Sequence, residues 1–593
     1  MSDTPTSTLP GDPSLTAAEP RTFALSRRLA QLTFHTNFEE ERFFLILSIF
    51  IGIFSGLAVV CFRVAIDWSR IALIGPLSHP TARRVIGAPT AVGLLVAILV
   101  IHFFPEVRGS GVNQTKAALY IYNGYIPFKN AVGKFLCSTL AIGSGQSLGP
   151  EDPSLQIGAS LASALGRRLD LSREKLRLLA PVGAAAGLAA AFNAPISAVL
   201  FVIEEVIGRW SAGILGSVVL SAISSVVVMR WFLGADALFR IPVTAFVRPA
   251  ELIAYAGLGI AGALAAAIFS RAIGFFAPRL RALPRAYQYF LPAAAGLLIG
   301  LIGWLGFPQV MGAGYEFMDQ AMHDQFTWKV LAALAGLKIL ATTLSFTSGT
   351  PGGMFAPTLF IGAMLGGAIG GIERHFFPLL TLSTGTYALV GMGVLFSAFL
   401  RAPMTSVFMV LEVSGNYSIV VPVIVANTVA YLISRSLQPV PIFDVLTRQD
   451  GLVLPSLEEQ REETVLRVED AMQSVPPVIL EGAAPLEQAD LRIHDLPDQV
   501  FLVRMDPSGW STITREHLGR MMKEGKSALT LGSVLPAQRL PYLYPDLPLD
   551  SALRCVSQAE IIPVVNRADA RELEGVVTRD HVLARYQADS PAD

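Results

Sequence analysis

The chain contains 593 residues, of which 52% are hydrophobic and 15% are charged, and its formal net charge at pH 7 is −1. Soluble domains carry about 25% charged residues. The composition therefore excludes a soluble globular protein and predicts a polytopic membrane protein, and the balanced charge gives no sign of a nucleic-acid partner.

Residues 1–42 precede the first apolar segment. They begin with a polar, proline-rich stretch that lacks the basic and apolar regions of a signal peptide, so we expect a disordered or amphipathic tail. Residues 43–62 carry no charge and reach the roughly 20 residues that span a bilayer, which predicts the first membrane helix. Arg27, Arg28 and Arg42 favour a cytoplasmic amino terminus, although three glutamates directly precede Arg42.

Two stretches of the apolar region repeat one sequence. At an offset of 204, residues 134–166 agree with 338–370 at many positions, among them Lys134 with Lys338 and Gly149 with Gly353. Glu204 matches Glu412 further along. Repeated apolar halves interrupted by glycine and proline are typical of transporters, whose site lies where the broken helices meet. We expect one membrane domain, residues 43–448, with halves at about 43–210 and 250–448.

Three segments rich in glycine and proline interrupt the apolar stretches, at residues 109–113, 143–153 and 348–357. Non-helical backbone at membrane depth must be buried in protein or line a wet cavity, because lipid cannot bond its amides. These breaks are therefore site candidates. The alternative is a close helix crossing that glycine permits.

The composition changes at residues 449–464, which are charged and predict a linker. Residues 465–590 then contain a weaker repeat at an offset of 64, in which residues 514–518 match 578–582 after a β-like run. We expect two small α+β modules in tandem. Cys61, Cys137 and Cys555 have no spacing that suggests a metal site or a disulfide framework.

Four motifs together carry a resemblance to a known family. They are Gly-Ser-Gly-Val at 109–112, Gly-Pro-Glu-Asp-Pro at 149–153, Gly-Gly-Met-Phe-Ala-Pro at 352–357, and the pair Phe-Asn-Ala-Pro at 192–195 and Arg-Ala-Pro at 401–403. The chain resembles the CLC family of chloride channels and chloride/proton exchangers, followed by a pair of CBS domains. The resemblance implies an all-α membrane protein of two inverted repeats with re-entrant helices, and a homodimer with one anion pathway in each subunit.

The resemblance also assigns an anion site. Chloride would bind the Ser110 hydroxyl, the Gly111 segment and the amides of Met354 and Phe355, where helix starts supply partial positive charge without a buried lysine or arginine. In the family a tyrosine hydroxyl near the last helix also binds the anion. Phe443 matches that tyrosine, so this hydroxyl is missing here. By resemblance, serine at 110 favours chloride over nitrate, and the alternative for Ser110 is a helix cap without a ligand.

Glu151 is the most specific single candidate for a functional residue. An ionised acid at mid-bilayer costs roughly 3 kcal/mol, so such a residue lies in a cavity, pairs or takes up a proton. By resemblance it is the gate, whose carboxylate competes with the anion; the alternative is an acid at the rim that caps a helix start. Pro150 and Asp152 replace the family's usual arginine and glycine, which predicts weaker binding at the outer anion site.

Glu205 lies at a position where, by resemblance, exchangers carry glutamate and many channels carry valine. The residue at the matching position of the second half, its repeat mate, is Val413. By resemblance a glutamate here is the internal proton station of an exchanger. The alternative is a solvated interfacial acid. Glu204 and Glu412 suggest instead a structural role shared by both halves, in which each bonds to helix ends. Lys134 and Lys338 are expected to support loops or helix ends.

We therefore expect a multi-pass cell-membrane protein, with both termini cytoplasmic, that exchanges chloride for protons. The alternatives are an uncoupled chloride channel gated by voltage or protons, and a CBS-regulated membrane sensor that transports nothing. No nucleophile, base and oxyanion constellation indicates an enzyme. Chloride would be the only bound ion and no metal or cofactor is expected.

CBS pairs in some families bind adenine nucleotides through a threonine or serine and an aspartate three residues later. The candidates here are Thr514 and Thr578, but His517 and His581 occupy the aspartate position, and Asp580 lies one place early. Nucleotide binding and a purely structural role in folding and dimer contact both stay open.

Overall fold

The computed structural model describes residues 37–75, 81–169, 171, 173–208, 212–235, 238–239, 251–377, 383–449, 451, 466–496, 499–505, 509–536, 540–556, 559–567 and 569–589. Arg27, Arg28 and nearly all of the expected linker lie outside these residues. The chain divides into two compact units, Met1–Gln460 and Arg461–Asp593.

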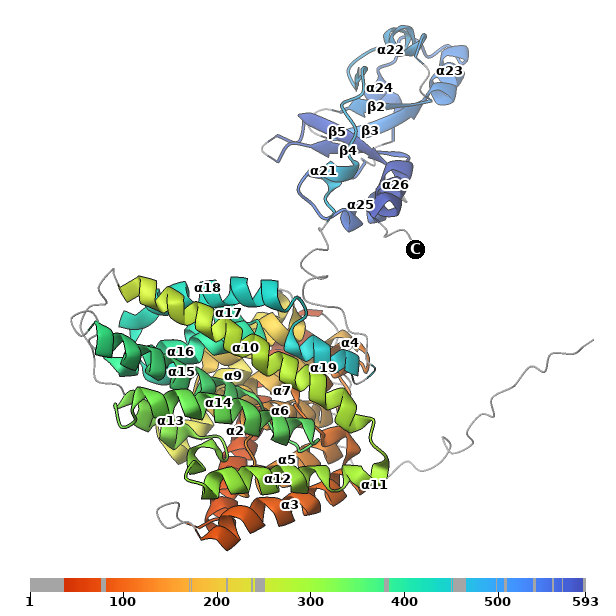
Figure 1. Cartoon of the computed structure of the whole chain (residues 1–593). Helices are drawn as coiled ribbons and strands as arrows, with labels where there is room; N and C mark the ends of the chain where they lie inside the picture. The colour runs from red at the N-terminus through yellow and green to blue at the C-terminus, as the bar shows by residue number, and fades with distance from the viewer. Residues whose placement is uncertain are drawn as a thin grey trace, which may run out of the picture. The chain divides into compact units, whose positions relative to one another are not determined.

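The first unit is helical (Figure 1). Its first half contains α2 (Asn37–Leu73), α3 (Ala82–His102), η2 (Pro105–Val107), α4 (Val112–Tyr120), α5 (Phe128–Gly143), α6 (Glu151–Gly166), α7 (Arg173–Phe192), α8 (Pro195–Phe201), the π-helix η3 (Val202–Ile207) and α9 (Ala212–Leu233). Its second half contains α10 (Glu251–Arg281), α11 (Arg285–Gln288), α12 (Leu291–Trp304), η4 (Pro308–Val310), α13 (Tyr315–Met322), α14 (Trp328–Thr347), α15 (Phe355–Phe376), α16 (Thr384–Leu400), α17 (Pro403–Ser414), η5 (Tyr417–Ile419), α18 (Val420–Leu437) and α19 (Ile442–Gln449).

Within the described ranges, nine helices are long and apolar enough to cross a membrane. The first is longer than expected, because α2 begins at Asn37, within the expected tail, and continues past Phe62 to Leu73. Arg63, Asp67 and Arg70 end the charge-free stretch, but their spacing of four and three residues places them on one face of the helix. Charges that share one face can line a cavity inside the protein, so they do not end the helix.

The two halves pack in the same way. Helix α6 lies against α7 as α15 lies against α16, and α2 contacts α9 as α10 contacts α18. Both central pairs cross at glycines. A Cβ on Gly158 would lie 2.2 Å from the Gly183 carbonyl oxygen, and a Cβ on its mate Gly362 would lie 2.3 Å from the Gly391 carbonyl oxygen. Such contacts let membrane helices approach closely without help from the hydrophobic effect.

The repeat mates Gly149 and Gly353 meet directly. Each donates its N–H to the carbonyl of the other at 2.8 Å, as in an antiparallel pair of strands. The chain directions of the two copies are therefore opposite at this point, which is the relation expected of inverted repeats. Gly145 and its mate Gly349 precede the pair with φ of 99° and 89°, a conformation that favours glycine.

Two buried lysines hold the loops ahead of this pair. Lys134 donates to the carbonyls of Val107 and Gly109 at 3.1 and 2.5 Å. Its mate Lys338 donates to the carbonyls of Val310 and Gly312 at 3.0 and 2.7 Å. The predicted role of both lysines in supporting loops is confirmed.

The second unit is an α+β region with two separate cores. In the first core, β1 (Leu480–Glu481) pairs parallel with β2 (Val500–Arg504), which pairs antiparallel with β3 (Trp510–Thr514). In the second, β4 (Ile561–Val565) pairs antiparallel with β5 (Leu573–Thr578). The helices are α21 (Val468–Ala471), α22 (Leu486–Ile493), α23 (Arg515–Lys523), α24 (Leu531–Val534), α25 (Asp550–Val556) and α26 (Arg579–Asp589).

Candidate functional site

The starts of α6 and α15 form the centre of the candidate site. Helix α6 begins at Glu151 and α15 begins at Phe355, directly after the Gly149–Gly353 pair. Each helix has a proline in its first turn, where the missing N–H breaks no helical hydrogen bond. Their first residues, Glu151 and Phe355, are fully buried, so both helix starts, with their partial positive charge, lie inside the protein.

Two carboxylates from α6 reach the amides at the start of α15. Glu151 Oε2 accepts from the Ala356 N–H at 3.3 Å, and Asp152 Oδ2 accepts from the Met354 N–H at 2.9 Å. The Phe355 N–H between them has no acceptor in the described part of the chain. One free amide donor thus lies at a helix start between two amides that already bind carboxylates, which is a suitable place for a small anion.

Glu151 and Asp152 are fully buried, so Glu151 does not lie at the rim, although it caps a helix start as the alternative expected. Glu151 Oε1 and Asp152 Oδ1 are buried without a hydrogen-bond partner among the described residues. A buried polar atom without a partner calls for an explanation such as a bound proton, water or ion. Asp152, which was expected to repel anions, also occupies the Met354 amide that the sequence assigned to the anion.

Ser110 and Gly111 lie at the start of α4, against α6. The buried Ser110 Oγ accepts from the Val112 N–H at 3.2 Å, and the Ser110 hydroxyl also hydrogen-bonds to the Asp152 carboxylate. A Cβ on Gly111 would lie 2.5 Å from the Asp152 carbonyl oxygen, so α4 and α6 are in close contact there. Lys134, which donates to the neighbouring Gly109 carbonyl, is a buried lysine near this site.

Phe443 lies in a buried aromatic cluster next to the start of α15. Its ring centroid is 6.3 Å from that of Phe355 and 6.4 Å from that of Phe201, with both pairs edge to face. Phe192 and Phe396 pack on Phe355 from other sides. Phe443 therefore contributes packing and ring edges, which carry partial positive charge, and no hydroxyl.

Glu205 is buried in a charged cluster that the sequence did not predict. On the π-helix η3, its Oε1 is 2.6 Å from Lys116 Nζ, and Lys116 Nζ is 3.5 Å from Asp444 Oδ1. The side chain of Glu205 is 1% exposed, so the alternative of a solvated interfacial acid is wrong. Lys116 comes from α4, six residues after Ser110, so one short helix joins the two candidate regions.

Glu204 and Glu412 each bind the helix start of the other half. Glu204 accepts from the backbone N–H groups of Met404 and Thr405 at 3.2 and 2.9 Å. Glu412 accepts from those of Ile196 and Ser197 at 2.9 and 2.7 Å. The prediction that these mates share a structural role at helix ends is confirmed.

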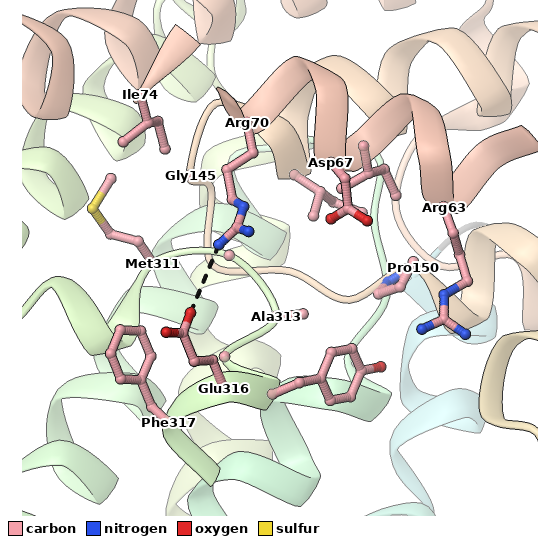
Figure 2. Close-up of a pocket in the computed structure, with 15 residues that line it drawn as sticks. Arg63, Asp67, Arg70, Ile74, Gly145, Pro150, Met311, Ala313, Glu316 and Phe317 are labelled. Atoms are coloured by element: carbon pink, nitrogen blue, oxygen red, sulfur yellow. Dashed lines mark ion pairs between the residues drawn. The ribbon is translucent and has the colours of Figure 1, made fainter. Parts of the chain in front are cut away.

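A cavity of about 260 Å³ lies beside Pro150, the residue that precedes Glu151. Pro150, Gly145 and part of α2 form one side, and residues 311–317 form the other (Figure 2). Arg63, Asp67 and Arg70 of α2 line it, and Arg70 pairs with Glu316 at 3.9 Å. The cavity was not predicted from the sequence, in which the charges that end the first apolar stretch were its only signal.

In the second unit, the candidate nucleotide residues have structural contacts. Thr514 caps α23 by accepting from the His517 N–H at 3.2 Å. Thr578 Oγ1 is 2.8 Å from His581 Nδ1, and His581 Nε2 is 2.6 Å from Gln473 Nε2. Asp580 is exposed.

A family model described as voltage gated chloride channel matches residues 92–435, more than half of the chain. The chain belongs to this CLC family. A CLC relative, the H(+)/Cl(−) exchange transporter ClcA of Yersinia pestis, is 31% identical over 445 residues, which are 73% of this chain and 92% of the relative.

Two solved CLC structures share the fold. A slow cyanobacterial Cl−/H+ antiporter is 25% identical with a TM-score of 0.64, over 71% of this chain and 99% of that chain. A eukaryotic CLC transporter is 20% identical with a TM-score of 0.59, over 91% of this chain and 97% of that chain, and it is similar in fold alone. The predicted fold class, a helical CLC membrane domain with a small α+β region, is confirmed.

Proposed function

We propose that this CLC protein exchanges chloride for protons across a membrane. The observation that carries the proposal is the position of Glu151, a buried carboxylate that accepts from the Ala356 N–H at the start of α15. A side-chain anion there competes with a transported anion for the same helix start. The likeness to an exchange transporter and to a Cl−/H+ antiporter supports the same conclusion.

Proton binding to Glu151 would open the site. A neutral carboxyl group is a weaker acceptor for the Ala356 N–H than a carboxylate, so the side chain can leave the start of α15. Chloride would then bind between the Phe355 N–H and the Ser110 hydroxyl. When Glu151 loses its proton, its carboxylate returns and displaces the anion, so one side chain couples the two ions.

Asp152 sets a condition on this cycle. Its carboxylate holds the Met354 N–H at 2.9 Å, so that amide takes part in chloride binding only when Asp152 moves or binds a proton. This requirement, together with the missing guanidinium and N–H at Pro150, supports the prediction that anion binding at the outer end of the site is weaker. Gly111 keeps α4 close enough for Ser110 to face the same place.

Glu205 would exchange protons with one side of the membrane. It is buried, it lies on a π-helix of the kind that often marks functional sites, and its second oxygen, Oε2, has no partner among the described residues. Lys116 holds the ionised form of Glu205, so each proton that Glu205 takes up must weaken this pair. An acid that alternates between pairing and protonation is suited to a relay.

The second candidate function is an uncoupled chloride channel. Phe443 supports it, because the ring offers no hydroxyl to hold chloride at the inner end of the site. Weaker closure at that end would let chloride pass without a proton.

Proteoliposomes test these functions. A chloride gradient should drive proton uptake, Glu151→Ala should abolish it, and Glu205→Val, which installs the residue of the mate position, should keep chloride flux and lose proton flux. Chloride flux without proton movement would indicate the channel. Absence of both fluxes would refute transport and leave the CBS-regulated sensor.

We also propose a homodimer with cytoplasmic termini, and a CBS pair in residues 465–590. The two cores of the second unit support the pair. If Thr514 and Thr578 serve only as caps, ATP or AMP leaves the thermal unfolding of the full protein unchanged. A shift that Thr578→Ala removes would instead show that nucleotide binds there.

A further inference from the structure

The cavity beside Pro150 contains an arginine that the proposed exchange cycle does not use. Four charged side chains line it, two basic and two acidic: Arg63, Asp67 and Arg70 from α2 and Glu316 from α13 (Figure 2). Arg70 and Glu316 form an exposed ion pair at 3.9 Å across the cavity. Arg63 differs, because it makes no hydrogen bond or ion pair with any residue that the structure describes.

Arg63 is half-buried, and Figure 2 shows its guanidinium beside Pro150. A guanidinium presents five N–H donors in a planar fork, and the Arg63 nitrogens are not buried away from solvent, so they can donate to water or to an anion in the cavity. Asp67 lies one helical turn further along α2 and partly offsets the charge of Arg63. The cavity therefore offers an unused cation whose attraction for an anion is moderated by a nearby acid.

The cavity is next to the gate. Pro150 lines it, and the following residue, Glu151, lies within the electrostatic range of Arg63. Proline supplies neither a charge nor an N–H at this point, so Arg63 is the cation that approaches the gate from the cavity. Water occupies about 30 Å³ per molecule in the liquid. A cavity of about 260 Å³ thus accommodates a chloride ion together with part of its water shell.

We infer that this cavity binds a small inorganic anion at the mouth of the pathway, with the Arg63 guanidinium as its ligand, before that anion reaches the Glu151 position. The inference rests on the proposed function, because it concerns the same pathway. Arg63 then sets the chloride concentration at which transport is half-saturated. The two acids of the cavity keep the binding weak, so the anion can move on.

Chloride-driven flux in proteoliposomes, measured against chloride concentration, tests the inference. Arg63→Gln should raise the half-saturating chloride concentration about five- to tenfold, because one nearby charge contributes on the order of 1 kcal/mol in a water-filled site. Arg70→Gln is the matched control, since it removes the same charge from the same cavity but from an existing ion pair, and it should change the value less than twofold. Pro150→Arg in the Arg63→Gln background should restore the wild-type value.

Two failures are distinguishable. If the wild type moves no chloride, the proposed function is wrong. If the wild type moves chloride and Arg63→Gln saturates at the same concentration, the inference is wrong and the proposed function stands. A second measurement needs no variant: in the wild-type protein, chloride should protect Arg63, but not Arg70, from modification by phenylglyoxal when compared with gluconate. Equal modification of Arg63 in both salts would overturn the inference.

Discussion

Replacing Lys116 by methionine should leave Glu205 buried without its cation. The two charged atoms are 2.6 Å apart and their side chains are 3% and 1% exposed, so water cannot replace the lost partner. Breaking a buried ion pair from one side costs about 3–5 kcal/mol. Protonating an ordinary glutamate at pH 7 costs about 3.7 kcal/mol, at about 1.36 kcal/mol for each pH unit above its usual pKa. The two costs are comparable, so Glu205 in the variant should bind a proton near neutral pH.

The stability of Lys116→Met should therefore depend on pH. Between about pH 5 and 7 the folded variant holds a proton at Glu205 that the unfolded chain releases, so its free energy of unfolding falls by up to about 1.4 kcal/mol for each unit of rising pH. Thermal unfolding in detergent at pH 5, 6 and 7 measures this slope. Lys116→Met/Glu205→Gln removes both charges, and it should regain stability at pH 7 and lose the slope.

The same variant should keep chloride flux and lose proton coupling, because a Glu205 that stays protonated cannot pass protons on. The reasoning is refuted if Lys116→Met unfolds at the wild-type temperature at every pH, or if the double variant is no more stable than the single one at pH 7. Either result would mean that the ion pair does not control the charge of Glu205.

Three further predictions concern the helix starts. Glu412→Gln weakens a carboxylate that accepts from the Ser197 backbone and hydroxyl, and should destabilise the protein by about 2–3 kcal/mol in thermal unfolding; an unchanged unfolding temperature would contradict this role. Gly149→Ala would place a methyl group 2.3 Å from Glu151 Oε2, so the Glu151 side chain should shift. In proteoliposomes the ratio of proton flux to chloride flux should then fall, and a wild-type ratio would count against the gate position. Asp152→Gly frees an amide of α15 and should tighten chloride binding in isothermal titration, and equal affinity would rule this out.

The arrangement of the two halves could be predicted because mates in the repeat keep their contacts. Lys134 and Lys338 bind equivalent carbonyls, and Gly149 meets Gly353. Identity at a constant offset carries this information, since a contact made by one copy recurs in the other. Glu204 could be assigned to a helix end for the same reason.

The charged partners of the site could not be predicted in this way. Lys116 lies 89 residues from Glu205 and 328 from Asp444, and no repeat mate indicates either contact. Arg63 marked the end of a charge-free stretch, but that charge alone did not indicate a cavity or the residues opposite it. Asp152 could be recognised as an acid beside the gate, but not as a hydrogen-bond acceptor for an amide on the other half, because its sequence neighbours do not fix the direction of its side chain.

The central claim is that the start of α15 holds a chloride ion for which Glu151 competes. Anomalous scattering from bromide-soaked crystals tests it most directly, because bromide replaces chloride and can be located without assumptions about transport. We expect a peak between the Ser110 hydroxyl and the Phe355 N–H that strengthens in Glu151→Gln, whose side chain no longer competes as an anion. No density at this place in either protein would contradict the account.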